Sequence, residues 1–475
     1  MRRNGIVFPV KTTSSDIAWL DLAEAGEGVQ RRTLSPVELT TACLERIERL
    51  NPQLNAFITV TADSALDEAR RAEREIGEGK WRGPLHGIPM ALKDLIETDG
   101  VRTTAASAVL RDYIPASDAP LVRRLREAGA VLLGKLNLHE FAYGGSAVIS
   151  HFGVTRNPWS PEHITGGSSS GSAAAVAAGL CYAAIGTDTA GSIRLPASCC
   201  GIVGLKPSYG LVSTRGVIPL SWSHDHAGPM TRTVADAALV LQAIASYDAE
   251  DIHSQKFPAV HYPAAMEETT SSLRLGVPRK FFWEELDGEI AQSCEAALRL
   301  LQRRTAGARD VEIPIPTDNF VFRCEPFAYH QKHLAQHAEE YHPDTLRRIR
   351  SGENVTALQY IEGYQKLREL RREILHTFSD VDLLITPTTP LLAPAIAALE
   401  ASPQELRPTE MRMLRNTRPF NVFGLPTISV PCGFSQSGLP IGLQIVGAPG
   451  AEGTVLALAR AFEREIDLKK RPPNL

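Results

Sequence analysis

The chain has 475 residues, of which 43% are hydrophobic and 22% charged, a balance typical of a soluble globular protein with a large core. Its formal net charge is −4 and it has no basic run, so charge gives no sign of a nucleic-acid partner. Seven cysteines at irregular spacing fit neither a disulfide framework nor a zinc site, and they predict buried, reduced thiols in a cytoplasmic protein.

Neither a signal peptide nor a membrane span is predicted. After Arg2 and Arg3, only residues 6–8 could begin an apolar core before Pro9, which is too short for a signal peptide. Residues 164–187 form a longer uncharged stretch, but glycine, serine and alanine dominate it, and it lacks the Leu, Ile and Phe content of a membrane span. We expect this stretch to be buried in protein and the chain to have no membrane partner.

Residues 1–80 predict an N-terminal helical segment. Ser35, Pro36 and Glu38 fit the N-cap, N1 and N3 positions of a capping box, and apolar residues then recur at helical spacing. A second amphipathic helix is expected over residues 62–76.

From residue 81 onward, strands and helices are expected to alternate, which predicts an α/β core over residues 81–475. This alternation favours a parallel or mixed sheet covered by helices. The weakly patterned stretches 249–273 and 390–408 could each be a linker, but neither divides the chain into separate domains. Helices are expected at 120–129 and 173–178, and strands at 87–92, 131–133, 182–186, 273–277, 383–386, 428–430 and 443–446.

Residues 166–172, Gly-Gly-Ser-Ser-Ser-Gly-Ser, lead directly into an alanine-rich helix. Such a tract is most often a flexible linker, but this position favours a turn whose glycines let the backbone approach another segment. No Gly-Lys-Ser/Thr follows, which excludes a P-loop. A nucleophile elbow centred on Ser169, with partners from residues 224–226, is an alternative. It needs a preceding strand, and two prolines within residues 157–161 oppose a central strand there.

Residues 186–196 place a second serine after another apolar run. Successive backbone N–H groups from Thr189 to Ser192 could converge on one point, as an oxyanion hole requires, and Ser192 could attack a carbonyl beside them. An isolated Gly-Ser pair is more often a tight turn with a hydrogen-bonded serine.

Lys93 ends a third apolar run, residues 87–92. Such a lysine is usually a strand terminus with its amine in solvent. If the lysine is desolvated instead, the neutral amine is favoured and can act as a base.

In combination and in this order, the three elements resemble the amidase-signature family. The Gly-Ser tract, the Ser192 loop and the Gly-Ile-Pro-x-x-x-Lys-Asp element of residues 87–94 match its motifs, and the 24-position spacing from Ser168 to Ser192 is the one the family uses. The resemblance covers nearly the whole chain, with further matches at residues 201–207, 228–232, 424–426 and 442–444.

The resemblance implies a fold and a mechanism. We expect one α/β/α domain over residues 1–475, built around a large mixed sheet. Ser192 would be the nucleophile of an amide hydrolysis, Ser168 the proton shuttle and Lys93 the neutral base. The family holds the middle serine behind a cis peptide bond, here Gly167–Ser168. No cofactor and no metal is implied.

The same resemblance assigns the remainder of the loop. Asp188 and Arg194 would shape its turn and take no part in the chemistry. Ser170 and Ala190 stand where many members of the family have glycine, and Ala190 constrains the turn mildly because alanine resists positive φ. The implied oxyanion hole consists of Thr189, Ala190, Gly191 and Ser192.

The substrate expectation depends on two positions that differ from the A subunit of tRNA-dependent amidotransferases, which is the alternative function. That subunit carries charged residues where this chain has Val148 and Leu414, so a glutamine ammonium would lack its partner. An apolar pocket favours neutral amides or carbamates. The chain is therefore interpreted as resembling general amidases and urethanases more than the A subunit. The expected substrate-binding residues are Tyr143, Gly144, Val148 and Leu414, and Phe141, Met411, Met413 and Phe420 are close in sequence.

These observations also predict the molecular partners. We expect a small-molecule amide or carbamate to bind a monomer or homodimer, with no nucleic acid in the complex.

Overall fold

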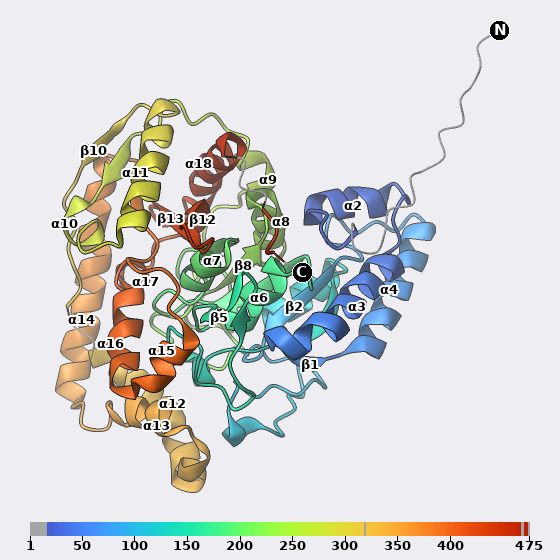
Figure 1. Ribbon diagram of the computed structural model, residues 1–475, viewed down its shortest axis with the longest axis horizontal. Coiled ribbons are helices and arrows are strands. Elements are labelled where there is room, and N and C mark those ends of the chain that lie inside the picture. The colour runs from blue at the N-terminus through green and yellow to red at the C-terminus, as the bar shows by residue number, and fades with distance from the viewer. Residues whose placement is uncertain (1–16, 318–319, 467–469, 474–475) are drawn as a thin grey trace.

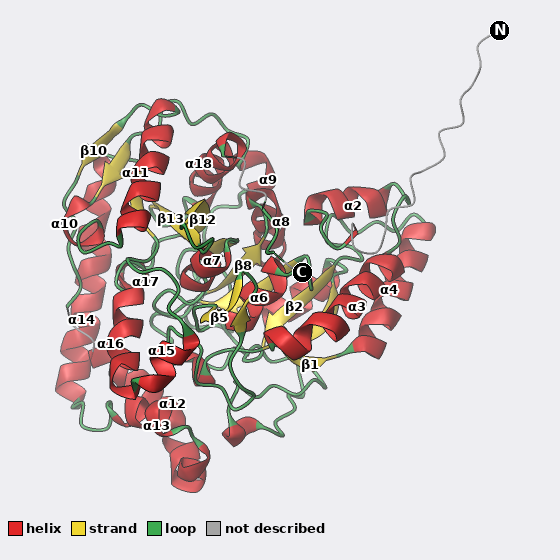
Figure 2. Ribbon diagram, in the orientation of Figure 1, coloured by secondary structure: helices red, strands yellow, loops and turns green. Residues whose placement is uncertain are grey.

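The computed structural model describes residues 17–317, 320–466 and 470–473, so the start of the chain considered for a signal peptide lies outside these ranges. An eleven-stranded mixed sheet runs through the molecule and helices flank it (Figures 1 and 2). The expected single α/β domain with a large mixed sheet is confirmed. The strand order is β1 (Phe57–Val60), β3 (Val131–Leu136), β2 (Pro89–Lys93), β6 (Ala183–Thr187), β8 (Ala227–Thr231), β7 (Val203–Lys206), β12 (Thr427–Phe434), β13 (Pro440–Gly447), β11 (Leu383–Pro387), β9 (Leu275–Val277) and β10 (Ala308–Asp310).

The helices gather at the two ends and over the middle of the sheet (Figure 1). They are α2 (Leu22–Gln30), α3 (Pro36–Leu54), α4 (Ala62–Gly77), α5 (Pro120–Glu127), α6 (Ser170–Ala177), α7 (Arg194–Cys200), α8 (Val234–Ile244), α9 (Tyr262–Ala265), α10 (Arg279–Phe282), α11 (Gly288–Arg303), α12 (Phe320–His337), α13 (Pro343–Arg350), α14 (Ala357–Glu373), α15 (Ile396–Ala401), α16 (Pro403–Met413), α17 (Arg418–Val422) and α18 (Glu452–Glu465).

The capping box at the start of α3 is present as predicted. The Ser35 hydroxyl accepts from the backbone N–H groups of Val37 and Glu38 at 3.0 and 3.3 Å, and Glu38 accepts from the Ser35 N–H at 3.2 Å. Pro36 begins the helix, where its missing N–H is not needed. The expected helix over residues 62–76 is α4. The N-terminal segment also contains a strand that was not predicted, β1, which pairs antiparallel with β3 at the edge of the sheet.

Strands β2 and β6 are parallel neighbours, with Leu92 opposite Ile185. Their carboxyl ends therefore lie side by side, and one carries Lys93 while the other leads into residues 186–196. Helix α6 packs against both strands, and α7 packs against β12 and β13. The pairing of β2 with β6 and the packing of α6 on both strands therefore bring Lys93, the Gly-Ser tract and residues 186–196 together at the carboxyl ends of these strands.

The uncharged stretch over residues 164–187 is buried throughout, in α6, β6 and the segments around them, as predicted. Its small side chains let α6 approach the sheet closely. A carbon added at Gly171 would lie 2.3 Å from the Ala56 carbonyl oxygen and 2.5 Å from the Asn137 nitrogen. Within the ranges that the structure describes, no helix is long and apolar enough to cross a membrane.

Candidate active site

Lys93 is fully buried at the end of β2. Its amine donates to the Ser168 hydroxyl at 2.7 Å and to the Thr187 hydroxyl at 2.8 Å. Burial lowers the pKa of the Lys93 amine to about 7, although the carboxylates of Asp188 and Asp225 act in the opposite direction. The neutral form that a base requires is therefore accessible near neutral pH.

Ser168 is also fully buried, and the Gly167–Ser168 peptide bond is cis, as the resemblance implies. Backbone bonds hold the segment on both sides. The Gly167 N–H donates to the Gly145 carbonyl at 2.7 Å, and the Ser168 carbonyl accepts from the His139 N–H at 3.1 Å. The Ser168 hydroxyl thus has a defined position beside the lysine.

Ser192 lies on the loop between β6 and α7 and lines a cavity together with Ala190. The Ser169 N–H donates to the Ser192 carbonyl at 3.3 Å, which joins this loop to the Gly-Ser tract. None of the four N–H groups from Thr189 to Ser192 donates to an acceptor among the described residues. They are therefore available to a ligand beside the Ser192 hydroxyl.

The positive φ in this loop falls on Gly191 and not on Ala190, so the alanine is tolerated. Gly191 has a φ of 140°, and a carbon added to it would lie 2.1 Å from the Thr417 hydroxyl oxygen. Ala190 is not among the described residues with positive φ, so the alanine meets no backbone penalty there. The Thr417 hydroxyl in turn donates to the Ala190 carbonyl at 2.6 Å and fixes the loop against the segment before α17.

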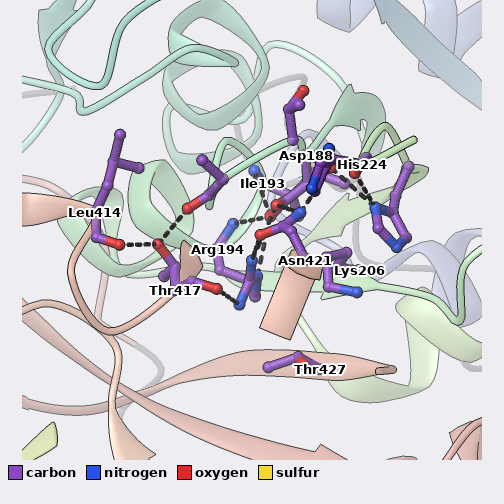
Figure 3. Close-up of polar contacts among 12 residues, drawn as sticks. Asp188, Ile193, Arg194, Lys206, His224, Leu414, Thr417, Asn421 and Thr427 are labelled. Atoms are coloured by element: carbon purple, nitrogen blue, oxygen red, sulfur yellow. Dashed lines mark hydrogen bonds and ion pairs between the residues drawn. The ribbon is translucent and has the colours of Figure 1, made fainter. Parts of the chain in front are cut away.

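A buried ion pair holds the turn from behind (Figure 3). The Arg194 Nε and Nη2 atoms donate to the two carboxylate oxygens of Asp188 at 3.0 and 2.9 Å, and Asp188 also accepts from the Ile193 N–H at 3.1 Å. Burial by itself would raise the pKa of Asp188, but the Arg194 guanidinium outweighs it and holds this pKa well below the usual value. Asn421, Gln444 and the Thr417 carbonyl also accept from Arg194, which lies away from the cavity lining. The pair therefore shapes the turn.

The alternative nucleophile, Ser169, is in a different setting. Its hydroxyl donates to the Thr187 carbonyl at 3.1 Å and is fully buried. The preceding strand β5 (Ser160–Ile164) pairs with β4 (Arg156–Asn157) in a separate two-stranded sheet, so no central strand leads into it. His224 contacts Ser221, and the Asp225 carboxylate accepts from Thr189 at 2.6 Å. This geometry does not support a nucleophile elbow.

The cavity at Ser192 has a volume of about 260 Å³. Of the predicted substrate-binding residues, Tyr143, Gly144 and Leu414 line it. Val148 is not in the lining and packs against the small apolar cluster that contains Leu414. Met411 also lines the cavity, whereas Phe141, Met413 and Phe420 are buried elsewhere in the core.

The walls are not purely apolar as the sequence suggested, because five arginines line the cavity beside its apolar side chains. No motif marked them, and they come from segments well separated in sequence on and beside α12, α13, α16 and α17. The high density of arginine over the residues of α13 is the one feature of the sequence that could have indicated a charged wall. The five are Arg323, Arg347, Arg348, Arg407 and Arg418.

Glu410 on α16 organises part of this wall and is fully buried. Its carboxylate contacts Arg348 at 3.0 Å and Arg407 at 3.3 Å, and it accepts from the Ser146 hydroxyl at 2.6 Å. The Arg348 Nη1 atom also donates to the Tyr143 carbonyl at 2.5 Å. The Arg348 Nε and Nη2 atoms are buried and have no hydrogen-bond acceptor in the described ranges.

Comparisons with known proteins agree on the family. A family model described as Amidase matches residues 38–456. The chain is 40% identical to the A subunit of the glutamyl-tRNA(Gln) amidotransferase of Moorella thermoacetica, over 97% of this chain and 99% of that protein. The corresponding A subunit of Geotalea daltonii is 41% identical, over 95% and 98%.

Solved structures give the same fold with several activities. The 6-aminohexanoate cyclic dimer hydrolase complexed with substrate matches with a TM-score of 0.87 at 30% identity, over 96% of this chain and 99% of that chain. The native peptide amidase of Stenotrophomonas maltophilia matches with a TM-score of 0.78 at 33% identity, over 95% and 98%.

These relatives correct two expectations. The interpretation that the chain resembles general amidases more than the amidotransferase A subunit is wrong, because the first curated relatives all carry that subunit's name. The expectation of a small-molecule partner only, without nucleic acid, is contradicted too, since those relatives are named as subunits of an enzyme that acts on a tRNA. Because the family model matches most of the chain and the relatives align over nearly its full length, the chain belongs to the amidase family, a family of C–N hydrolases.

Proposed function

We propose that the chain hydrolyses an amide that carries a carboxylate group, through an acyl-enzyme on Ser192. The observation that carries this proposal is Arg348. It lines the cavity that contains Ser192, its side chain is only 5% exposed, and its Nε and Nη2 atoms lack an acceptor among the described residues. A buried charged donor without a partner is costly, and a ligand carboxylate supplies the acceptors.

The same molecule illustrates the geometry of such a contact. Arg194 uses its Nε and Nη2 atoms to bind both carboxylate oxygens of Asp188. A substrate carboxylate would make the equivalent contact with Arg348. The guanidinium group is anchored for this purpose, because its Nη1 atom is held by Glu410 and the Tyr143 carbonyl.

In the proposed mechanism, the Ser192 hydroxyl attacks the amide carbonyl and its proton passes through Ser168 to neutral Lys93. The N–H groups from Thr189 to Ser192 stabilise the oxyanion. The C–N bond then breaks, and the proton returns from Lys93 through Ser168 to the leaving amine. Water hydrolyses the acyl ester by the same relay and releases the acid.

A second candidate is the glutamine-hydrolysing component of a tRNA-dependent amidotransferase, and the names of the curated relatives favour it. Glutamine also carries a carboxylate and a side-chain amide, so it belongs to the substrate class above. In that case the chain would work with partner subunits and pass ammonia to an aminoacyl-tRNA. Release of ammonia from glutamine only when such partners are added would support this function.

The test uses a fluorophosphonate label and a matched pair of substrates. We expect the label to modify Ser192, as read by peptide mapping. We expect glutaryl 4-nitroanilide to be hydrolysed with a kcat/KM at least tenfold above that of its methyl ester, which has nearly the same shape but no charge. Equal rates would restore the neutral amide or carbamate that the sequence suggested, and labelling of Ser169 would contradict the mechanism.

A further inference from the structure

The cavity wall carries more positive than negative charge. Five arginines line it, and no aspartate or glutamate in the described part of the chain does. Two carboxylates lie close behind. Glu410 contacts Arg348 and Arg407, and Asp344 contacts Arg347 at 2.6 Å. Leaving Arg418 aside, the four guanidinium groups of Arg323, Arg347, Arg348 and Arg407 lie beside only these two carboxylates.

An ammonium group in the cavity would need an acceptor, and two carbonyl groups of the wall already accept from arginines. The Ser351 carbonyl accepts from Arg323 at 3.0 Å, and the Tyr143 carbonyl accepts from Arg348. Glu410 is fully buried and accepts from Ser146 in addition to its two arginines.

Aromatic faces are the other means of holding an ammonium, and arginines occupy those as well. The guanidinium carbon of Arg407 lies 5.8 Å from the centre of the Tyr143 ring, and that of Arg418 lies 5.8 Å from the centre of the Phe322 ring. Both rings line the cavity. A substrate ammonium would compete with a cation that the protein already holds there.

We propose that the substrate is an anion and not a zwitterion: an amide with a carboxylate but no ammonium group, such as the ω-amide of a dicarboxylic acid. This rests on the proposed function and narrows its substrate class. It separates this chain from an enzyme whose substrate is free glutamine. Leu414 lines the cavity beside the nucleophile loop. An acidic side chain at this position would therefore change the preference between glutamine and an amide without an ammonium group.

The first experiment compares three primary amides with the full chain and measures ammonia release. Glutaramate has the carboxylate only, glutamine has the carboxylate and the ammonium, and methyl glutaramate has neither charge. We expect the kcat/KM for glutaramate to exceed that for glutamine by at least tenfold. Equal values for the two would overturn the inference and leave the proposed function standing. A preference for methyl glutaramate over both would overturn the proposed function itself.

The second experiment places a charge on the wall and uses an isosteric control. Leu414→Asp should raise the ratio of glutamine to glutaramate turnover at least tenfold, whereas Leu414→Asn should leave that ratio within about threefold of the original. The same shift in both variants would show a steric effect and contradict the electrostatic argument. Should the aspartate variant not fold, as judged by thermal melting, the comparison of the three amides decides the question alone.

Discussion

The proposed catalytic loops and the cavity wall meet at Ser192 but are built in different ways. These loops, residues 166–172 and 186–196 with Lys93, are buried, and Lys93 and residues 186–196 lie at the ends of the paired strands β2 and β6. The wall consists of long charged side chains on α12, α13, α16 and α17. Backbone bonds and the buried Arg194–Asp188 pair set the positions in the first region, and a side-chain network around Glu410 sets them in the second.

This difference separates two kinds of function. A relay in which a proton moves over hydrogen-bond distances needs atoms held by the sheet itself. Selection of a charged substrate needs only a few donors in a water-poor cavity, and a side chain that reaches in from a helix can supply them. We therefore expect changes in the loops to remove activity on every substrate, and changes in the wall to alter which substrate is used.

The largest effect is expected from the catalytic loops. Ser192→Ala, Ser168→Ala and Lys93→Ala should each lower kcat/KM roughly 10⁴-fold or more, for charged and neutral anilides alike. The three act as a unit, so a double variant should be little worse than the more severe single one. Ser169→Ala, whose hydroxyl is bound to the Thr187 backbone, should retain activity, and an inactive Ser169→Ala beside an active Ser192→Ala would reverse the assignment.

The pH profile gives the next effect. In the proposed relay only neutral Lys93 accepts a proton, and the pKa of Lys93 is lowered to about 7. Below that pH, kcat/KM should fall about tenfold per unit, and above it the rate should be level. The carboxylate of Asp225 raises this pKa, so Asp225→Asn should move the acid limb to lower pH. An acid limb that stays in place would show that another group controls the rate.

On the cavity wall, Arg348→Met should raise KM for glutaryl 4-nitroanilide roughly 10- to 100-fold, the range for a hydrogen bond to a charged group. The methyl ester should change by less than threefold, because it makes no ionic contact. Arg350→Met, an exposed neighbour on α13, is the matched control and should behave as the original protein. An equal loss on both substrates would indicate that Arg348 only supports the fold.

The smallest effect is expected from Glu410→Gln. The glutamine keeps an acceptor for the Ser146 hydroxyl but no longer attracts Arg348 and Arg407 ionically. KM for the charged anilide should rise about three- to tenfold while kcat on the methyl ester is unchanged. A fall in kcat on both substrates would mean that Glu410 positions the catalytic loops instead of the wall.

The sequence predicted the features that depend on residues close together in the chain. The Ser35 capping box, the strands that carry Lys93 and residues 186–196, and the buried small-residue helix all follow from local patterns. Strands β7 and β8 were not predicted because they are short and interrupted by glycine or proline. They are strands because central neighbours complete their hydrogen bonds.

The cavity wall could not be predicted from local sequence patterns. Arg323, Arg348 and Arg407 are separated by many positions, and only the packing of three helices brings them to one cavity. The apolar neighbours in sequence, Phe141 and Phe420, were expected near the substrate but lie in the core. Side chains close in sequence to a motif therefore gave a poorer indication of the substrate than charged helices distant from it.

The parallel pairing of β2 and β6 has a consequence for how enzymes of this kind can diversify. The separation of Lys93 from the Thr187 end of β6 is set by the spacing between adjacent strands, about 4.8 Å, a constant of peptide geometry that mutation cannot alter. Helices α12, α13 and α16, which carry arginines of the cavity wall, are not part of that sheet. A lineage can exchange or reshape those helices over many generations, and the proposed proton relay will keep its dimensions. An engineer who seeks a new substrate can randomise the same helices for the same reason.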